Sequence, residues 1–289
     1  MKSIVTSFLA LVLTIGATAQ SYIPAVKLTA GKKYEVVTLV DGKMTQDAMG
    51  QTMEIPMNIS TTSALSIIGA SDKGYSTEYV ANKVVLSMSA MGQDINYDSD
   101  KKEDREGQLG SSINKMIGAT TKFTVDAKGN IIKESVVKPV EDKKEDDNSD
   151  MMGMMMKNLG LGNAGACPVF DLFTNVTEIK VGDSFVDSTS TKTPDDKTKT
   201  STTYTLKEIK DGIAFFTFTG TIDIEKKVEQ MGMEMNVTSN AKVNGDMQID
   251  VATGLLVKKV SVSESTGSVD VQGMSIPTTG KVTSTISVK

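Results

Sequence analysis

Residues Tyr204–Thr219 read YTLKEIKDGIAFFTFT and decide the fold class. Apolar and polar residues alternate on both sides of the turn Lys210-Asp211-Gly212, which is typical of two half-buried strands joined by a tight hairpin. Val260-Ser261-Val262-Ser263 alternates as a half-solvated strand does, and further turns are expected at Asp41-Gly42 and Thr253-Gly254. The sequence therefore predicts a mainly β protein, built as a twisted antiparallel sheet or an unclosed β-barrel.

Helical patterns are few and short. Apolar residues recur at helical spacing at Leu109, Ile113, Met116 and Ile117, and again from Val169 to Val176. Each segment is long enough to cover part of a sheet and too short to form a domain of its own. The sequence therefore predicts one or two short helices packed against the sheet.

Composition excludes several kinds of chemistry. The chain has 289 residues, no histidine, a formal charge of −5 and a single arginine, Arg105. Histidine bases and histidine metal ligands are thus absent, and a chain this acidic and poor in arginine is a poor partner for nucleic acid. Cys167 lies in an apolar context and is expected to be a buried structural thiol, with an intermolecular disulfide as the alternative. We expect no enzymatic activity, no cofactor and no metal site.

The first nineteen residues have the pattern of a signal peptide. Lys2 precedes an apolar run from Ile4 to Ile15, and Ala17-Thr18-Ala19 places small residues where a signal peptidase cleaves. The run is too short to span a bilayer, and no later stretch is apolar enough to be a transmembrane segment. We therefore expect cleavage after Ala19 and a periplasmic or secreted protein.

The remaining chain divides into two halves around a linker. Residues 141–166 are rich in acidic residues, methionine and glycine, which is typical of a flexible linker. Residues 20–140 and 167–289 are the expected N-terminal and C-terminal β halves. Similar segments, such as those after Gly31 and Gly182, suggest an internal repeat; the alternative is a set of β-hairpins built alike. The two halves are expected to form one continuous sheet.

Methionine is unusually abundant, with eighteen residues. Several methionines lie in strand-like segments at even spacing, which would place neighbours on one face of a strand. Thioethers can bind Cu(I), but methionine is also a flexible filler of cores and of binding grooves. The candidate ligand-lining residues are Met53, Met57, Met88, Met91, Met231, Met233 and Met235.

Four segments together resemble a known family. They are the aromatic strand after Gly31-Lys32-Lys33, the Met-rich hairpin Met44–Met57, the segment Met88–Ser99, and Val181–Phe185. In these segments the chain resembles an uncharacterised domain-of-unknown-function family of exported, Bacteroidetes-type envelope proteins. The resemblance implies an exported, β-rich protein and supplies neither an activity nor catalytic residues. Separately, an unclosed β-barrel of the expected kind is similar in general plan to the periplasmic lipoprotein carriers, which is a likeness of fold alone.

Two functions remain open from the sequence. One is a non-catalytic envelope protein that binds a lipid or another apolar small molecule in a Met-lined concavity. The other is a structural or interaction protein that contacts another envelope protein and has no small-molecule ligand. An open apolar cavity would favour the first hypothesis, and a solid core would favour the second.

Overall fold

The computed structural model describes residues 20–48, 50–90, 93–107, 109–114, 117–137, 167–170, 176–230 and 233–289. Within these ranges, the side chains at 48, 90, 93, 111, 112, 133–137, 229, 230 and 233 are not described. The predicted signal peptide (1–19) and the predicted linker (141–166) lie outside the described residues, as do positions 171–175 of the second predicted helix.

The described residues form a chain of long strands with two very short helices. In chain order the elements are β1 (Ser21–Tyr22), β2 (Lys33–Ala48), β3 (Gln51–Ser71), β4 (Gly74–Ala90), β5 (Gln93–Asp98), α1 (Lys102–Glu106), α2 (Gly110–Ile113), β6 (Thr120–Val125), β7 (Ile131–Val137), β8 (Ile179–Lys180), β9 (Ser184–Lys192), β10 (Asp196–Lys210), β11 (Ile213–Gln230), β12 (Met233–Asp250), β13 (Leu256–Val271) and β14 (Met274–Val288). The prediction of a mainly β protein is confirmed.

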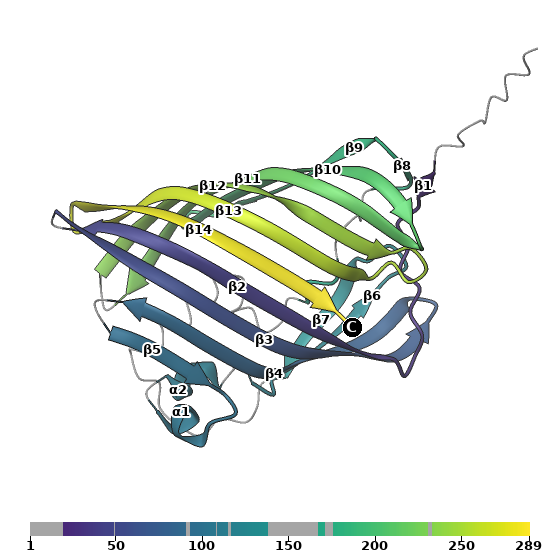
Figure 1. The fold of residues 1–289 in the computed structure, drawn as a ribbon, viewed down its shortest axis with the longest axis horizontal. Helices are drawn as coiled ribbons and strands as arrows, with labels where there is room; N and C mark the ends of the chain where they lie inside the picture. Colours follow the sequence, from purple (N-terminus) through teal and green to yellow (C-terminus); the bar gives the residue numbers. More distant parts are fainter. Residues whose placement is uncertain are drawn as a thin grey trace, which may run out of the picture.

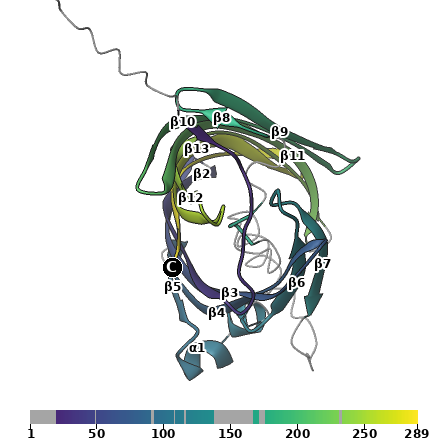
Figure 2. The same cartoon turned by 90° about the vertical axis from the view of Figure 1, so that its right-hand side faces the viewer.

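Twelve strands form one antiparallel sheet. Their order is β7-β6-β4-β3-β2-β14-β13-β12-β11-β10-β9, with β5 paired to β4 beside β6, while β1 and β8 form a separate two-stranded sheet. The sheet curls around an interior without closing, so that β7 and β9 are its edge strands (Figures 1 and 2). The prediction of a twisted antiparallel sheet or unclosed barrel is confirmed.

Two groups of strands meet where β2 pairs with β14. Strands β2 to β7 come from the N-terminal part of the chain and β9 to β14 from the C-terminal part, and the β2–β14 pair is the contact that makes them one sheet. Val36 lies opposite Val288, and Glu35 and Lys289 exchange two backbone hydrogen bonds of 2.9 Å. The last residues of the chain therefore complete the sheet beside its first long strand.

One face of the sheet, which we call the inner face, carries the core. Along β3, every second side chain from Met57 to Ile67 is buried, and the residues opposite them on β2 and β4 point to the same side. One core cluster surrounds Leu65, Phe216 and Met247, and a second surrounds Met57 and Leu86. Side chains that alternate with these residues form the outer face.

A segment near the N-terminus, residues 23–32, crosses one open end of the curled sheet (Figure 2). We call this segment the strap. The Val26 N–H donates to the Ala127 carbonyl in the β6–β7 turn, at 2.8 Å, and the Lys27 N–H donates to the Thr253 carbonyl in the β12–β13 turn, at 2.9 Å. Val26 is buried in the first core cluster. The strap therefore connects turns from the two strand groups.

The prediction of a turn at Asp41-Gly42 is wrong. Gly42 lies inside β2, between Val282 of β14 and Met57 of β3. A Cβ at Gly42 would lie 2.8 Å from the Lys281 carbonyl oxygen and 2.9 Å from Cγ2 of Val282. Glycine at this position therefore allows β14 to approach closely, and the strand continues through it.

The first predicted helix is shorter than its pattern suggested. The segment forms α1 and the four-residue α2; Ile113 lies in α2, Leu109 and Ile117 lie outside the helices, and Met116 is not among the described residues. Tyr97 of β5 donates a hydrogen bond of 2.8 Å to Asn114, which holds the end of α2 beside the sheet. Val169 and Phe170, the described start of the second predicted helix, lie in a turn and a bend.

Candidate functional site

Two predicted ligand-lining methionines lie directly opposite each other. Met57 of β3 faces Met88 of β4 across the strand pair, on the inner face. Their side chains are 1% and 7% exposed and pack in the second core cluster with Ile113 of α2. The two thioethers therefore lie in the core of the protein, and they could form only the floor of a binding site.

Two other predicted methionines lie on the same face but are half-buried. Met53 is four residues before Met57 on β3, and Met235 is twelve residues before the buried Met247 on β12, so all four side chains point to the inner face. Met44 of β2, opposite Ile55, adds a third half-buried methionine that the sequence-based set did not include. These side chains lie toward the end of the sheet that is opposite the strap.

The other three predicted ligand-lining methionines have no described side chain. Met91 and Met231 lie outside the described residues, and Met233 begins β12 without a described side chain. The structure therefore places four of the seven predicted methionines on the inner face, two in the core and two in a half-buried position.

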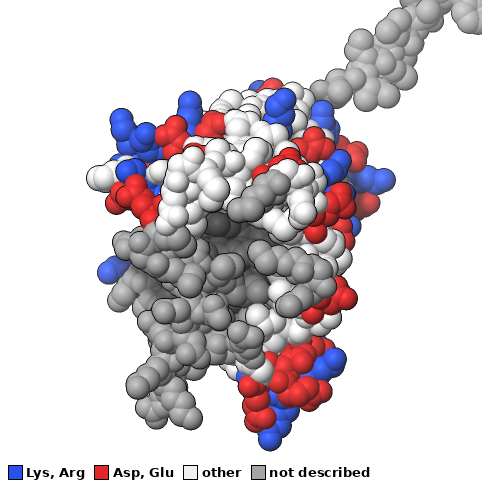
Figure 3. Space-filling view, turned by 90° about the vertical axis from the view of Figure 1, so that its left-hand side faces the viewer, with Lys and Arg blue, Asp and Glu red and all other residues white. Residues whose placement is uncertain are grey.

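The far end of the inner face is mainly apolar, although its side chains include Lys226 of β11, which lies opposite Val237 and forms an ion pair of 3.2 Å with Asp196. This end comprises the inner-face residues nearest the ends of β2, β11 and β13. It combines the half-buried methionines with half-buried aliphatic residues at Ile222, Ile224, Val228, Val237, Val269, Val271 and Ile276. Figure 3 looks at this end of the molecule, where the described atoms above the centre of the view are mostly uncharged.

A polar strip follows on β13, between the far end and the first core cluster. Register with β12 places Lys259, Ser261, Ser263 and Ser265 on the inner face, opposite Met247, Gly245, Val243 and Ala241. The valines that alternate with these serines, Val260 and Val262, therefore face outward. Sequence alternation showed a half-solvated strand but could not show that its serines face the interior.

Lys259 lies where the polar strip meets the core. Its neighbours across the strand pairs are Met247 of β12 and Ile286 of β14. Its ammonium nitrogen lies 5.1 Å from the centre of the Phe218 ring, within the range of a cation–π contact. Burial lowers the pKa of Lys259 because the charged form loses its hydration.

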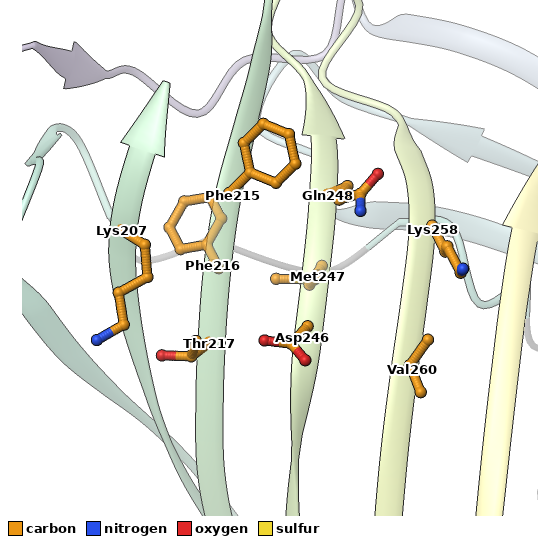
Figure 4. Close-up of a pocket in the computed structure, with 9 residues that line it drawn as sticks. All are labelled: Lys207, Phe215, Phe216, Thr217, Asp246, Met247, Gln248, Lys258 and Val260. Atoms are coloured by element: carbon orange, nitrogen blue, oxygen red, sulfur yellow. The ribbon is translucent and has the colours of Figure 1, made fainter. Parts of the chain in front are cut away.

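The outer face of the same strands carries a mixed, open pocket of about 360 Å³ (Figure 4). Its lining includes the charged residues Lys207, Asp246 and Lys258 and the half-buried Phe215 and Val260. The charges of Asp246 and the two lysines partly compensate each other, and the apolar lining is small. This pocket is therefore a weaker candidate for an apolar ligand than the far end of the inner face.

In the ranges that the structure describes, no three acidic or thiol side chains lie close enough together to hold a metal ion. No helix among the described residues has the length and apolar character needed to cross a membrane.

Comparison with solved structures gives distant matches. A lipovitellin structure described by its lipid–protein interactions has 12% identity and a TM-score of 0.46 over 91% of this chain, which spans 25% of the lipovitellin chain. Pseudomonas aeruginosa OccK2 in complex with glucuronate has 5% identity and a TM-score of 0.26, with 90% of this chain and 100% of that chain covered. Salmonella typhi OmpF in complex with daunomycin has 7% identity and a TM-score of 0.27, with 92% and 100% covered. Matches this distant support no conclusion about function.

Sequence comparison is more decisive at the family level. No curated protein matches the chain. A family model described as a family of unknown function, DUF6263, matches residues 72–256, which run from the β3–β4 turn to the start of β13 and make up more than half of the chain. The matched segment includes Met88, Met235 and the core residue Phe216. The protein therefore belongs to this family of unknown function, DUF6263.

Proposed function

We propose that this protein is a non-catalytic binding protein that holds a lipid or another apolar small molecule at the far end of its inner face. One observation carries the proposal. Half-buried methionine and aliphatic side chains, among them Met53, Met235 and Val237, face inward at the end of the sheet opposite the strap. Water in contact with this surface is unfavourable, and an apolar ligand would displace it.

Methionine suits such a surface. Its side chain is unbranched and polarisable, so it can adapt to ligands of different shape at little cost. Each 100 Å² of apolar surface that a ligand covers contributes roughly 2.5 kcal/mol to binding before the entropic costs of association. A ligand that covers several of these side chains would therefore bind in the micromolar range or better.

The test uses the protein from residue 20 to 289. Organic extraction of the purified protein, followed by mass spectrometry, should recover an amphiphile, and the extracted protein should bind the apolar probe 1-anilinonaphthalene-8-sulfonate. Met235→Ser should weaken probe binding about 5- to 30-fold, since about 1–2 kcal/mol of apolar contact is lost. Leu39→Ser is the matched control, because Leu39 is 49% exposed on the outer face of β2.

Two results would contradict the proposal. One is a protein that carries no extractable amphiphile and binds no probe at millimolar concentration. The other is equal probe affinity in the Met235→Ser variant and the wild type.

We also propose that the protein acts outside the cytoplasm after removal of residues 1–19. The fold uses the chain from the predicted cleavage point onward, since the Gln20 carbonyl accepts a hydrogen bond of 2.9 Å from the Val181 N–H and Tyr22 is buried in the core. N-terminal sequencing of protein from the envelope fraction should begin at Gln20. Protein recovered only from the cytosol with Met1 or Lys2 at its start would contradict export.

A second candidate function is favoured by the edge of the sheet. In the described chain, β9 pairs on one side only, with β10, and most of its residues are exposed, including Val186 at 62%. Such an edge can accept a strand from another protein. An envelope protein that copurifies with the wild type and is lost in a Val186→Pro variant would support an interaction role without a small-molecule ligand.

A further inference from the structure

Lys259 is unusual among the lysines of the structure. The described ion pairs involve lysines near the surface, such as Lys43 with Glu54 and Lys281 with Glu264. Lys259 instead lies on the inner face between Met247, which is 1% exposed, and the half-buried Ile286. Among the described residues its ammonium group has an aromatic ring beside it and no carboxylate.

The contact between Lys259 and the Phe218 ring depends on a glycine at position 245. Phe218 of β11 lies directly opposite Gly245 of β12, and a Cβ at Gly245 would lie 2.7 Å from Cζ of the Phe218 ring. The ring therefore extends over the glycine toward β13, where the ammonium of Lys259 lies 5.1 Å from its centre. A larger residue at position 245 would displace the ring from this position.

The aromatic contact alone does not balance the burial of the charge. A cation–π contact contributes about 0.5–2 kcal/mol, and the half-buried ammonium group of Lys259 has lost part of the hydration that stabilises its charge. The described residues that face it across the strands, Met247 and Ile286, are apolar. Burial without a neighbouring charge is also the one cause that lowers the pKa of Lys259. The ammonium group is thus available for a negatively charged partner.

Hydroxyl groups lie next to it along the polar strip. Ser261 follows Lys259 on the inner face of β13 and lies opposite Ser284 of β14. Both serines are half-buried, and within the described residues neither hydroxyl has a recorded hydrogen-bond partner. One ammonium group and two hydroxyl donors on one face can bind an anion of single charge, such as a carboxylate.

We propose that Lys259, with Ser261 and Ser284, binds the carboxylate headgroup of a single-chain amphiphile whose apolar chain lies along the inner face toward Met235. This inference rests on the proposed function and specifies the class of ligand. From Lys259 to Val271 at the far end of β13 there are twelve residues, or about 40 Å of strand at roughly 3.3 Å per residue. An extended acyl chain fits within that length.

The experiment compares two ligands that differ only in the headgroup. Oleate and oleyl alcohol are titrated against the probe-loaded protein, residues 20–289, with wild type, Lys259→Met and Lys258→Met. Lys258 is the matched control, because it is the adjacent residue of β13 and its side chain lies in the outer pocket. Acetate is titrated as a carboxylate without an apolar chain.

Wild type should bind oleate at least tenfold more tightly than oleyl alcohol, because the carboxylate gains a charged partner. Lys259→Met should remove that preference by weakening oleate alone, while Lys258→Met should keep it. Acetate should not displace the probe at millimolar concentration. Lys259→Arg should retain at least part of the preference, since it keeps the charge, and thermal denaturation should show that each variant is folded.

The titrations distinguish a wrong headgroup assignment from a failure of the proposed function. If wild type binds oleate and oleyl alcohol equally, or if Lys259→Met binds oleate as wild type does, the headgroup assignment is wrong and the proposed function stands. If wild type binds neither ligand and carries no extractable amphiphile, the proposed function fails with it.

Discussion

Gly254 and Ala25 approach each other so closely that no side chain fits between them. A Cβ at Gly254, in the β12–β13 turn, would lie 2.1 Å from the carbonyl oxygen of Ala25 in the strap. The backbone of Gly254 also has a φ of +72°, which residues other than glycine rarely adopt. Glycine at this position thus allows the strap to dock across the open end of the sheet.

We therefore predict that Gly254→Ala destabilises the protein by about 2–4 kcal/mol, because it adds a steric clash to the cost of the positive φ. Gly273→Ala is the matched control, since Gly273 has a φ of +84° and no atom within 4 Å of an added Cβ, so it should cost about 1 kcal/mol. Urea denaturation measures both. Equal losses would show that the contact with the strap contributes nothing.

The two kinds of methionine on the inner face should respond differently to truncation. Met57→Ala should lower the free energy of unfolding by about 2–5 kcal/mol, because Met57 is 1% exposed and its removal leaves a cavity. Met53→Ala should cost less than about 1 kcal/mol, because Met53 is half-buried, yet it should weaken binding of the apolar probe. Thermal denaturation measures the loss of stability, and probe titration measures the loss of binding. A larger loss of stability in Met53→Ala than in Met57→Ala would contradict the placement of Met57 in the core and of Met53 at the binding surface.

Alkaline pH should destabilise the protein through its buried tyrosines. Burial raises the pKa of Tyr79 to about 12, whereas an unfolded tyrosine titrates near 10. The unfolded state therefore loses its proton first, so the stabilisation from neutral Tyr79 is complete below about pH 10 and is lost as the pH rises toward 12. The loss amounts to roughly 3 kcal/mol.

Tyr79→Phe isolates this contribution. The variant should lose less stability than wild type between pH 9 and pH 11, because phenylalanine does not titrate. Urea denaturation at the two pH values measures the difference. The same pH dependence in both proteins would show that Tyr79 does not contribute to it.

Cys167 should be unreactive in the folded protein. Its side chain is 5% exposed and packs in the first core cluster with Val169 and Phe170. A thiol reagent such as Ellman's reagent should modify it at least about 100-fold more slowly in buffer than in guanidinium chloride, since modification requires the core to open. Similar rates in the two solvents would show that the thiol is accessible in the folded state.

The alternation in Tyr204–Thr219 was sufficient to predict the fold class, because apolar residues at every second position are typical of a β-strand with one buried face. The length of β2 was not predictable in the same way. Asp41-Gly42 has the composition of a turn, and only the packing of β14 against the strand explains the glycine. Local sequence does not contain that contact, since Val282 is 240 residues away along the chain.

The candidate site was predictable only in part. Even spacing within a strand predicted that Met53 and Met57 share a face, but it could not tell a core position from a half-buried one. Lys259 was missed because Lys258 stands beside it, and the sequence does not show which of the two faces inward. The pairing of Lys259 with Met247 decides this, and it depends on the register between β12 and β13.

The pairing of β2 with β14 also sets the order in which the molecule can fold. Strands β3 to β7 can form hairpins as soon as they are synthesised, but the two strand groups cannot join until residues 278–288 are available to pair with 36–46. Contacts between such distant parts of the chain form slowly, because a long loop must close before they can form. During that time the free edge of β2 is open to pairing with other chains. If the protein is exported as we propose, a chain held unfolded until its C-terminus has crossed the membrane would avoid this hazard.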